Sequence, residues 1–72
     1  MKKTFIIEDL ECAHCAAKME QAVKNIDGVI DASVNFLKSS ITVEAEDEIF
    51  DKVMKQAVKE CKKIEPDAEI VL

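Results

Sequence analysis

DLECAHCAAKME, at residues 9–20, is the stretch on which the rest of the chain depends. It stands where a run of β-forming residues gives way to a helix-like pattern. It also holds two of the three cysteines, Cys12 and Cys15, with two residues between them. Two thiols at this spacing can close on one soft or borderline metal ion, and they can also form a disulfide. The stretch therefore predicts a strand-to-helix loop that carries thiol chemistry.

The second cysteine and the residue before the first one extend this prediction to a ligand set. Cys15 falls in the first turn of the expected helix, where unpaired N–H groups and the positive end of the helix dipole stabilise a thiolate. We therefore expect a lowered pKa for the Cys15 thiol. Glu11 precedes the pair, and its carboxylate can reach the same centre as a third, oxygen ligand. The predicted metal ligands are Cys12, Cys15 and Glu11.

Length and composition predict one small folded domain over residues 1–72. Hydrophobic residues make up 49% of the chain and charged residues 35%, with one Gly and one Pro. This supplies enough apolar surface for a single core, near the lower size limit at which a core suffices without other support. Three cysteines, an odd number, do not suggest the disulfide framework of a secreted domain, so a reducing compartment is expected.

The charge balance excludes several classes of function. There are 15 acidic and 10 basic residues, giving a net charge of −5, and three Phe but no Trp or Tyr. Nucleic-acid binding needs a basic face with stacking aromatic side chains, so we exclude it. No apolar run approaches membrane-spanning length, and residues 5–7 are too short for the core of a signal peptide. We expect a cytoplasmic, monomeric domain that does not insert into the membrane.

Periodic apolar residues predict the first half of the fold. Residues 3–8 alternate, as in a strand with one buried face. From residue 13 to residue 26, apolar side chains recur at three- and four-residue steps, which indicates a helix with one buried side. Asp27-Gly28 is expected to end this helix, with Gly28 as its left-handed C-terminal cap.

The second half repeats the pattern after a hairpin. Residues 29–36 alternate, residues 37–40 form a turn, and Ile41 and Val43 place a further strand on the same core. Asp47 is expected to begin a second helix, and residues 68–72 form a last strand. The order strand, helix, strand, strand, helix, strand predicts an α+β, ferredoxin-like βαββαβ fold, with a four-stranded antiparallel sheet and both helices on one face.

Several segments together resemble the heavy-metal-associated domain over nearly the whole chain. They are LECAHC at residues 10–15, AAKME at 16–20, Gly28-Val29 and ASVNF at 32–36. The family's common motif is Gly-Met-x-Cys-x-x-Cys; here Asp9 stands in place of Gly and Leu10 in place of Met. The family includes soluble metallochaperones and the cytosolic N-terminal domains of metal-transporting P-type ATPases. The resemblance implies the same fold, a bound heavy-metal ion, and a membrane ATPase or another metal-binding domain as partner.

Glu11 favours a divalent ion within that family. Copper(I) members usually carry a neutral residue before the first cysteine, whereas zinc, cadmium and lead members often carry an acid there. Cu(I) is satisfied by two thiolates, while a divalent ion gains from further ligands and negative charge. Residues 62–69 also resemble the ending of cadmium- and zinc-type ATPase domains. We therefore expect one Zn(II), Cd(II) or Pb(II) ion. A copper(I) chaperone is the first alternative, and a thiol-disulfide redox protein the second.

Three other residues could approach the ion. His14 lies between the cysteines and is expected to face solvent. Cys61 falls on the apolar stripe of the second helix and is expected to pack as a small hydrophobic residue. Glu65 can supply a carboxylate from the end of that helix, although a solvated turn also accounts for it. We find no catalytic constellation, so the domain is not predicted to be an enzyme.

Overall fold

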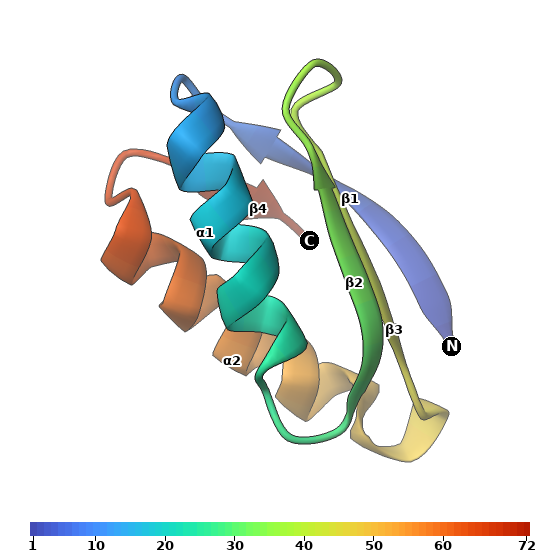
Figure 1. The fold of residues 1–72 in the computed structure, drawn as a ribbon. Helices are drawn as coiled ribbons and strands as arrows, with labels where there is room; N and C mark the ends of the chain where they lie inside the picture. Colours follow the sequence, from blue (N-terminus) through green and yellow to red (C-terminus); the bar gives the residue numbers. More distant parts are fainter.

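The computed structural model describes residues 1–72 as two layers, a four-stranded sheet and two helices that cover one of its faces (Figure 1). The elements are β1 (Lys2–Glu8), α1 (Ala13–Lys24), β2 (Val29–Asn35), β3 (Ser40–Ala45), α2 (Phe50–Ile64) and β4 (Glu69–Val71). The strands are antiparallel and lie in the order β2-β3-β1-β4. The predicted ferredoxin-like α+β fold is confirmed.

β1 is the strand that leads into the cysteine loop, and it has neighbours on both sides. Its first part pairs with β3, with Phe5 opposite Ile41, and its end pairs with β4, with Ile7 opposite Ile70. Beyond the last β1–β3 pair, the Ile7 N–H donates to the carbonyl oxygen of Ser39 at 2.7 Å. The cysteine loop therefore begins from a central strand that is held on both sides.

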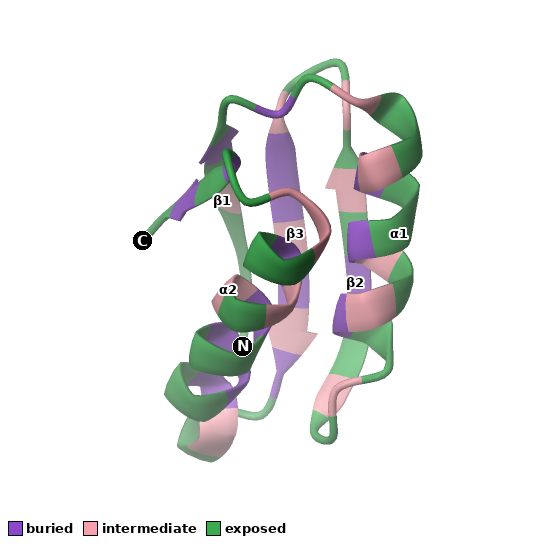
Figure 2. Ribbon diagram, turned by 90° about the vertical axis from the view of Figure 1, so that its left-hand side faces the viewer, coloured by how far each residue is buried: buried purple, intermediate pink, exposed green.

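The core lies between the sheet and the helices, and the alternation along the strands fills it (Figure 2). In β1, Ile7 is 1% exposed while its neighbour Ile6 is 55% exposed, as the predicted alternation requires. The other members of the core are Leu10, Ala16, Met19, Val23, Ala32, Ile41, Val43, Ala45, Phe50, Val53, Met54, Ala57, Cys61, Ala68 and Ile70. Both helices contribute through one buried face, which confirms their predicted amphipathic pattern.

α1 ends earlier than the sequence predicts. Its last helical residue is Lys24, and Asn25 caps it by donating its backbone N–H to the Gln21 carbonyl. Gly28 has φ +97° but lies in a separate turn, which the Val29 N–H closes onto the Ile26 carbonyl at 3.1 Å. The prediction that Gly28 directly caps the helix is wrong: the left-handed conformation is needed where the chain enters β2, not where the helix stops.

α2 begins three residues later than expected. Asp47–Ile49 form a 3-10 turn, with the Ile49 N–H bonded to the Glu46 carbonyl at 3.1 Å, and the α-helix starts at Phe50. The tighter i to i+3 spacing lets the chain reverse from β3 within a few residues. The predicted apolar stripe is otherwise present, with Phe50, Val53, Met54, Ala57 and Cys61 buried.

The outer edge of β2 is partly covered by α1. β2 pairs only with β3, so its other edge carries backbone groups without a strand partner. The Val34 N–H on that edge donates to Glu20 Oε1 of α1 at 3.0 Å. The Glu20 side chain thus satisfies one backbone group of the edge strand and joins α1 to the β2 edge of the sheet.

Candidate metal centre

The cysteine loop follows the end of β1 and begins with a backbone turn at Asp9. Asp9 has φ +60°, the left-handed region in which Gly is most at ease and Asp is among the better-tolerated alternatives. This explains in physical terms why Gly is usual at this place in the motif. Leu10, which replaces the usual Met, is buried at 7% exposure and anchors the loop to the core. Both departures from the common motif are therefore compatible with the loop.

Cys12 is the N-cap of α1. Its backbone is extended, with φ −122° and ψ 116°, and its carbonyl accepts the Ala16 N–H at 3.0 Å. Its Sγ accepts a hydrogen bond from the Cys15 backbone N–H at 3.3 Å. A thiol sulfur thus takes the place of the oxygen that usually caps a helix. Both loop thiols belong to half-buried residues, so they remain open to an incoming ion.

The two thiols differ in acidity. Hydrogen bonds from the side chain and then the backbone of Cys15 lower the pKa of Cys12 from its ordinary value of 9.0. The pKa of Cys15 is raised to about 12, first by its hydrogen bond with the Cys12 side chain and then by the Glu65 carboxylate. We expected Cys15 to be the activated thiol, and this is wrong. The helix N-terminus stabilises the sulfur that accepts its N–H groups, and that sulfur belongs to the cap residue.

Glu65 is the carboxylate that the fold brings to the thiols. It follows α2 directly as its C-cap, where its N–H bonds to the Cys61 carbonyl at 2.9 Å. Its negative charge acts on Cys15 and, more weakly, on Cys12. The sequence indicated Glu65 as a carboxylate that could approach the ion, with a solvated turn as the alternative. Its position follows from the fold, because the α2–β4 connection and the β1–α1 loop lie at the same end of the sheet (Figure 1).

The side chains of the remaining candidates do not form a ligand set with the thiols. Glu11 is exposed and makes no hydrogen bond or ion pair, and His14 is exposed, as predicted. Cys61 is 2% exposed, which confirms the prediction that it packs in the core. No group of three or more His, Cys, Asp or Glu side chains is preassembled to hold a metal ion. The residues present fit an open, two-thiol arrangement rather than a closed four-ligand structural site.

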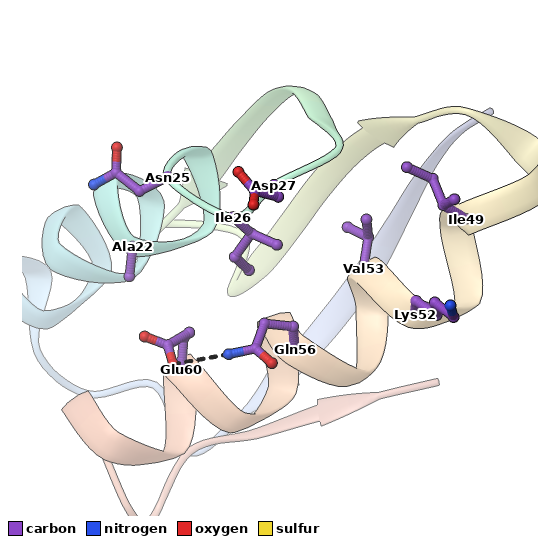
Figure 3. Close-up of a pocket in the computed structure, with 9 residues that line it drawn as sticks. All are labelled: Ala22, Asn25, Ile26, Asp27, Ile49, Lys52, Val53, Gln56 and Glu60. Carbon is purple, nitrogen blue, oxygen red and sulfur yellow. Dashed lines mark hydrogen bonds between the residues drawn. The ribbon is translucent and has the colours of Figure 1, made fainter.

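The largest hollow of the molecule lies elsewhere. It is an open groove of about 790 Å³ between the end of α1 and the length of α2, and neither loop thiol lines it. Figure 3 shows its apolar floor, with Ile26 and Val53, and a polar rim on which Gln56 donates to Glu60 at 3.2 Å. The rim holds no Cys or His, and the groove has no convergent set of soft donors. The thiol chemistry is therefore confined to the loop.

Comparison with known proteins agrees with this geometry. The family model described as "Heavy-metal-associated domain" matches residues 4–65, which include the whole loop and both helices. The chain belongs to the heavy-metal-associated domain family. Such domains are metal-binding modules, and the predicted family membership is confirmed.

Relatives of this heavy-metal-associated domain fall into two groups. It is 33% identical over 70 residues to a "Cadmium, zinc and cobalt-transporting ATPase" of Bacillus subtilis, covering 97% of this chain and 10% of the relative. It is 43% identical over 68 residues to a "Probable cadmium-transporting ATPase" of Listeria monocytogenes, covering 94% of this chain and 9% of the relative. It is also 34% identical over 55 residues to the "Copper chaperone CopZ" of Staphylococcus aureus, covering 75% of this chain and 81% of the relative.

Solved structures place the heavy-metal-associated domain among metal-handling proteins of the same fold. A structure named "CopZ metallochaperone" superimposes with a TM-score of 0.76 at 28% identity, covering 99% of this chain and 100% of the other. The N-terminal domain of a potential copper-translocating P-type ATPase from Bacillus subtilis gives the same TM-score at 30% identity, covering 99% and 84%. The chain spans only about a tenth of the two ATPase relatives. No helix of the domain is long and apolar enough to cross a membrane.

Proposed function

We propose that this domain captures one heavy-metal ion between the thiolates of Cys12 and Cys15 and passes it to a partner. The observation that carries the proposal is the pair of half-buried cysteines at the start of α1, where the Cys15 backbone N–H donates to Cys12 Sγ at 3.3 Å and no closed set of ligands surrounds the thiols. Here the ion is cargo. An open coordination position lets a partner's ligand bind before the first ligands leave, so exchange can be fast even when affinity is high.

The cargo is a divalent ion, Zn(II), Cd(II) or Pb(II). Two carboxylates support this choice. The negative charge of Glu65 acts on Cys15, and Glu11 precedes Cys12 with its side chain exposed at the loop surface. Divalent ions gain from an oxygen donor and added negative charge, whereas Cu(I) is satisfied by two thiolates. Two relatives are named as cadmium transporters, one of them also for zinc and cobalt, and they agree with this reading.

Of the two carboxylates, Glu65 is the better placed oxygen ligand. It needs no rearrangement of the loop to act on Cys15, because the cap of α2 fixes its backbone. Glu11 belongs to the same ligand set as originally predicted, but it must turn toward the thiols from an exposed position. We assign Cys12 and Cys15 as the primary ligands, and Glu65 and Glu11 as oxygen ligands that the ion recruits.

The domain acts as a cytoplasmic carrier rather than as an enzyme. It serves either as the N-terminal metal-binding domain of a heavy-metal P-type ATPase or as a free metallochaperone. Its partner is then the transporter, or another metal-binding domain that supplies entering thiols. The domain comprises residues 1–72 and acts as a monomer. Support comes from its similarity both to short regions of ATPases and to 81% of the length of a chaperone.

A competition titration tests this function. The reduced protein is titrated with Zn(II), Cd(II), Pb(II) and Cu(I) against chelators of known affinity. Cys12→Ser and Cys15→Ser should each lower the affinity for every one of the four ions by at least about 100-fold, because all four ions bind thiolates as soft donors. Glu65→Gln should lower the affinity for the divalent ions by about tenfold or more and leave the affinity for Cu(I) nearly unchanged.

Asp67→Asn is the matched control for Glu65→Gln, because it removes one negative charge from the same exposed connection. Equal losses for Asp67→Asn and Glu65→Gln would show a general charge effect instead of ligation. Glu11→Gln, measured beside them, separates the two carboxylates. One-to-one divalent binding that is lost in both cysteine variants supports the proposal, and absence of divalent binding contradicts it.

A copper(I) chaperone is the second candidate. The specific observation in its favour is the 34% identity to a copper chaperone over 81% of that protein's length. Tight Cu(I) binding with weak divalent binding and no effect of Glu11→Gln or Glu65→Gln would select it. A thiol-disulfide function would instead give catalytic turnover with a disulfide substrate, which a metal carrier does not give.

A further inference from the structure

Five lysines share the solvent side of α2. They are Lys52, Lys55, Lys59, Lys62 and Lys63, and all five are exposed. With 3.6 residues per turn, they occupy an arc of about 100° directly opposite the buried face of the helix, and no other residue of α2 falls within that arc. Figure 2 shows the exposed side of α2 turned away from the sheet. We call these five residues the lysine row.

The charge of the lysine row is largely unneutralised. Lys63 pairs with Glu60 at 3.2 Å, and the other four lysines form no ion pair. On α1, by contrast, Lys24 lies 4.0 Å from Glu20, and the solvent side of that helix is a mixture of polar and small residues. The concentration of charge is therefore a property of α2 alone and not of the helical layer as a whole.

Charge is separated between the two sides of the molecule. α2 contains five of the chain's ten basic residues and only two of its 15 acidic residues. The uncovered face of the sheet has the opposite character, with Glu8, Asp31, Glu44 and Glu69 against the single Lys2. A protein with a net charge of −5 thus presents one positive side. Such a distribution orients the molecule in the field of a charged partner.

We propose that the lysine row binds the anionic phospholipid surface of a membrane. The row spans about 15 Å along a straight helix and suits a flat surface. The row contains no aromatic or apolar side chain and no Arg, which are the residues that anchor protein–protein interfaces. Lys itself is depleted at such interfaces. Clusters of four to eight basic residues are typical of segments held at anionic lipid headgroups. The proposal goes beyond the metal-carrier function and uses none of the metal-loop residues.

This binding fixes how the metal loop is presented. α2 lies parallel to the membrane, and the acidic face of the sheet points away from it. The thiols lie at the C-terminal end of α2, beside Glu65, so they remain at the flank of the bound domain and open to a protein in the same membrane.

Vesicle co-sedimentation tests the proposal. The metal-free, reduced domain is mixed at low ionic strength with vesicles of equal parts phosphatidylglycerol and phosphatidylcholine, and with vesicles of phosphatidylcholine alone. One variant, Lys55→Gln/Lys59→Gln/Lys62→Gln, neutralises three lysines of the row. Its control, Lys2→Gln/Lys18→Gln/Lys38→Gln, neutralises three lysines outside the row, so that net charge is matched. Binding to the anionic vesicles should fall at least about tenfold in the first and change less than about twofold in the second.

Equal losses in the two variants, or wild-type binding that does not depend on phosphatidylglycerol, would overturn the proposal. Absence of wild-type binding would do the same. A second measurement needs no variant: nanodiscs of the anionic composition should broaden the NMR amide signals of α2 before those of α1. Polyglutamate at the same charge concentration serves as a model of an acidic protein and distinguishes such a partner from a lipid surface. Stronger binding to polyglutamate than to the vesicles would overturn the lipid surface in favour of an acidic protein.

Discussion

The backbone N–H of Ile7 donates to the carbonyl oxygen of Ser39 across 2.7 Å, and this bond ties the last part of β1 to the β2–β3 turn. A residue with positive φ stands at each side of it: Ser39 itself at +48° and Asp9 at +60°. Left-handed backbone is unfavourable for residues other than Gly, with Asp and Asn the best tolerated. The geometry of the cysteine loop is therefore held in place against a local backbone preference.

Asp9 offers a direct test of this preference. Asp9→Val should destabilise the fold by about 1 to 2 kcal/mol, because a β-branched residue is poorly tolerated at positive φ. Asp9→Gly should change stability by less than about 0.5 kcal/mol or increase it, since the relief of strain offsets the entropy that Gly loses on folding. Urea unfolding measures both. Equal stability of the two variants would mean that the turn adapts to either residue.

Gly28 should be sensitive for two separable reasons. Its φ of +97° is unfavourable for any side chain, and an added Cβ would lie 2.4 Å from Ile49 Cδ1. Gly28→Ala should therefore cost about 1 to 3 kcal/mol in urea unfolding. Ile49→Val removes the colliding methyl group and serves as the background for a second Gly28→Ala measurement. The cost should shrink there without vanishing; a cost that vanishes would show that only the collision matters.

Alkylation should distinguish the loop thiols. The lowered pKa of Cys12 makes its thiolate more available than that of Cys15, whose pKa is raised to about 12. In the metal-free protein at pH 7, iodoacetamide should modify Cys12 at least about tenfold faster than Cys15, even though a less basic thiolate is a weaker nucleophile. Peptide mass spectrometry over time gives the two rates. Faster modification of Cys15 would contradict the assigned hydrogen-bond direction.

Cys61 should make stability depend on pH in the alkaline range. Burial raises the pKa of its thiol from 9.0 to about 11, with a smaller effect of Glu60. Below pH 9 the thiol is neutral in both states and has no effect. Between pH 9 and 11 the unfolded chain ionises first, so folding is progressively weakened, by about 2 to 3 kcal/mol in total.

The loop thiols are removed for this measurement by working in a Cys12→Ser/Cys15→Ser background. Urea unfolding is followed at pH 8 and pH 10.5, with and without Cys61→Ala. The loss of stability between pH 8 and pH 10.5 should be smaller in the variant that lacks Cys61. The two proteins share all their other ionisable groups, so the difference between them reports on the Cys61 thiol. An identical loss in both proteins would show that the Cys61 thiol does not carry the effect.

The fold could be predicted from the sequence because its two periodicities are clear. Alternation in β1 and the three- and four-residue steps of the helices each identify one buried face, and those faces make the core. The errors fall at Gly28 and Asp47, where a turn decides the boundary. Their geometry depends on tertiary contacts, such as the close approach of Gly28 to Ile49, which local preference does not encode. The bond from Val34 to Glu20 was missed for the same reason.

For the candidate site, the loop and its two thiols could be predicted, but their chemistry could not be assigned fully. Whether Cys12 or Cys15 is the more acidic depends on which sulfur accepts the helix N–H, and that depends on which residue caps the helix. Glu65 is far from the loop in sequence, and only the packing of α2 against the sheet brings it to Cys15. Side-chain charge near a loop can be read from sequence only when the neighbour is local.

Cys12 Sγ has two roles if it binds an ion: it is a ligand, and it is also the acceptor that caps the first turn of α1. Coordination draws electron density from the sulfur and so weakens it as an acceptor, while fraying of the turn frees the same sulfur to donate to the ion. By thermodynamic linkage, the order of this helix end and the affinity for cargo must influence each other equally. Any partner that unwinds or tightens the first turn of α1 thereby gains control over release of the ion.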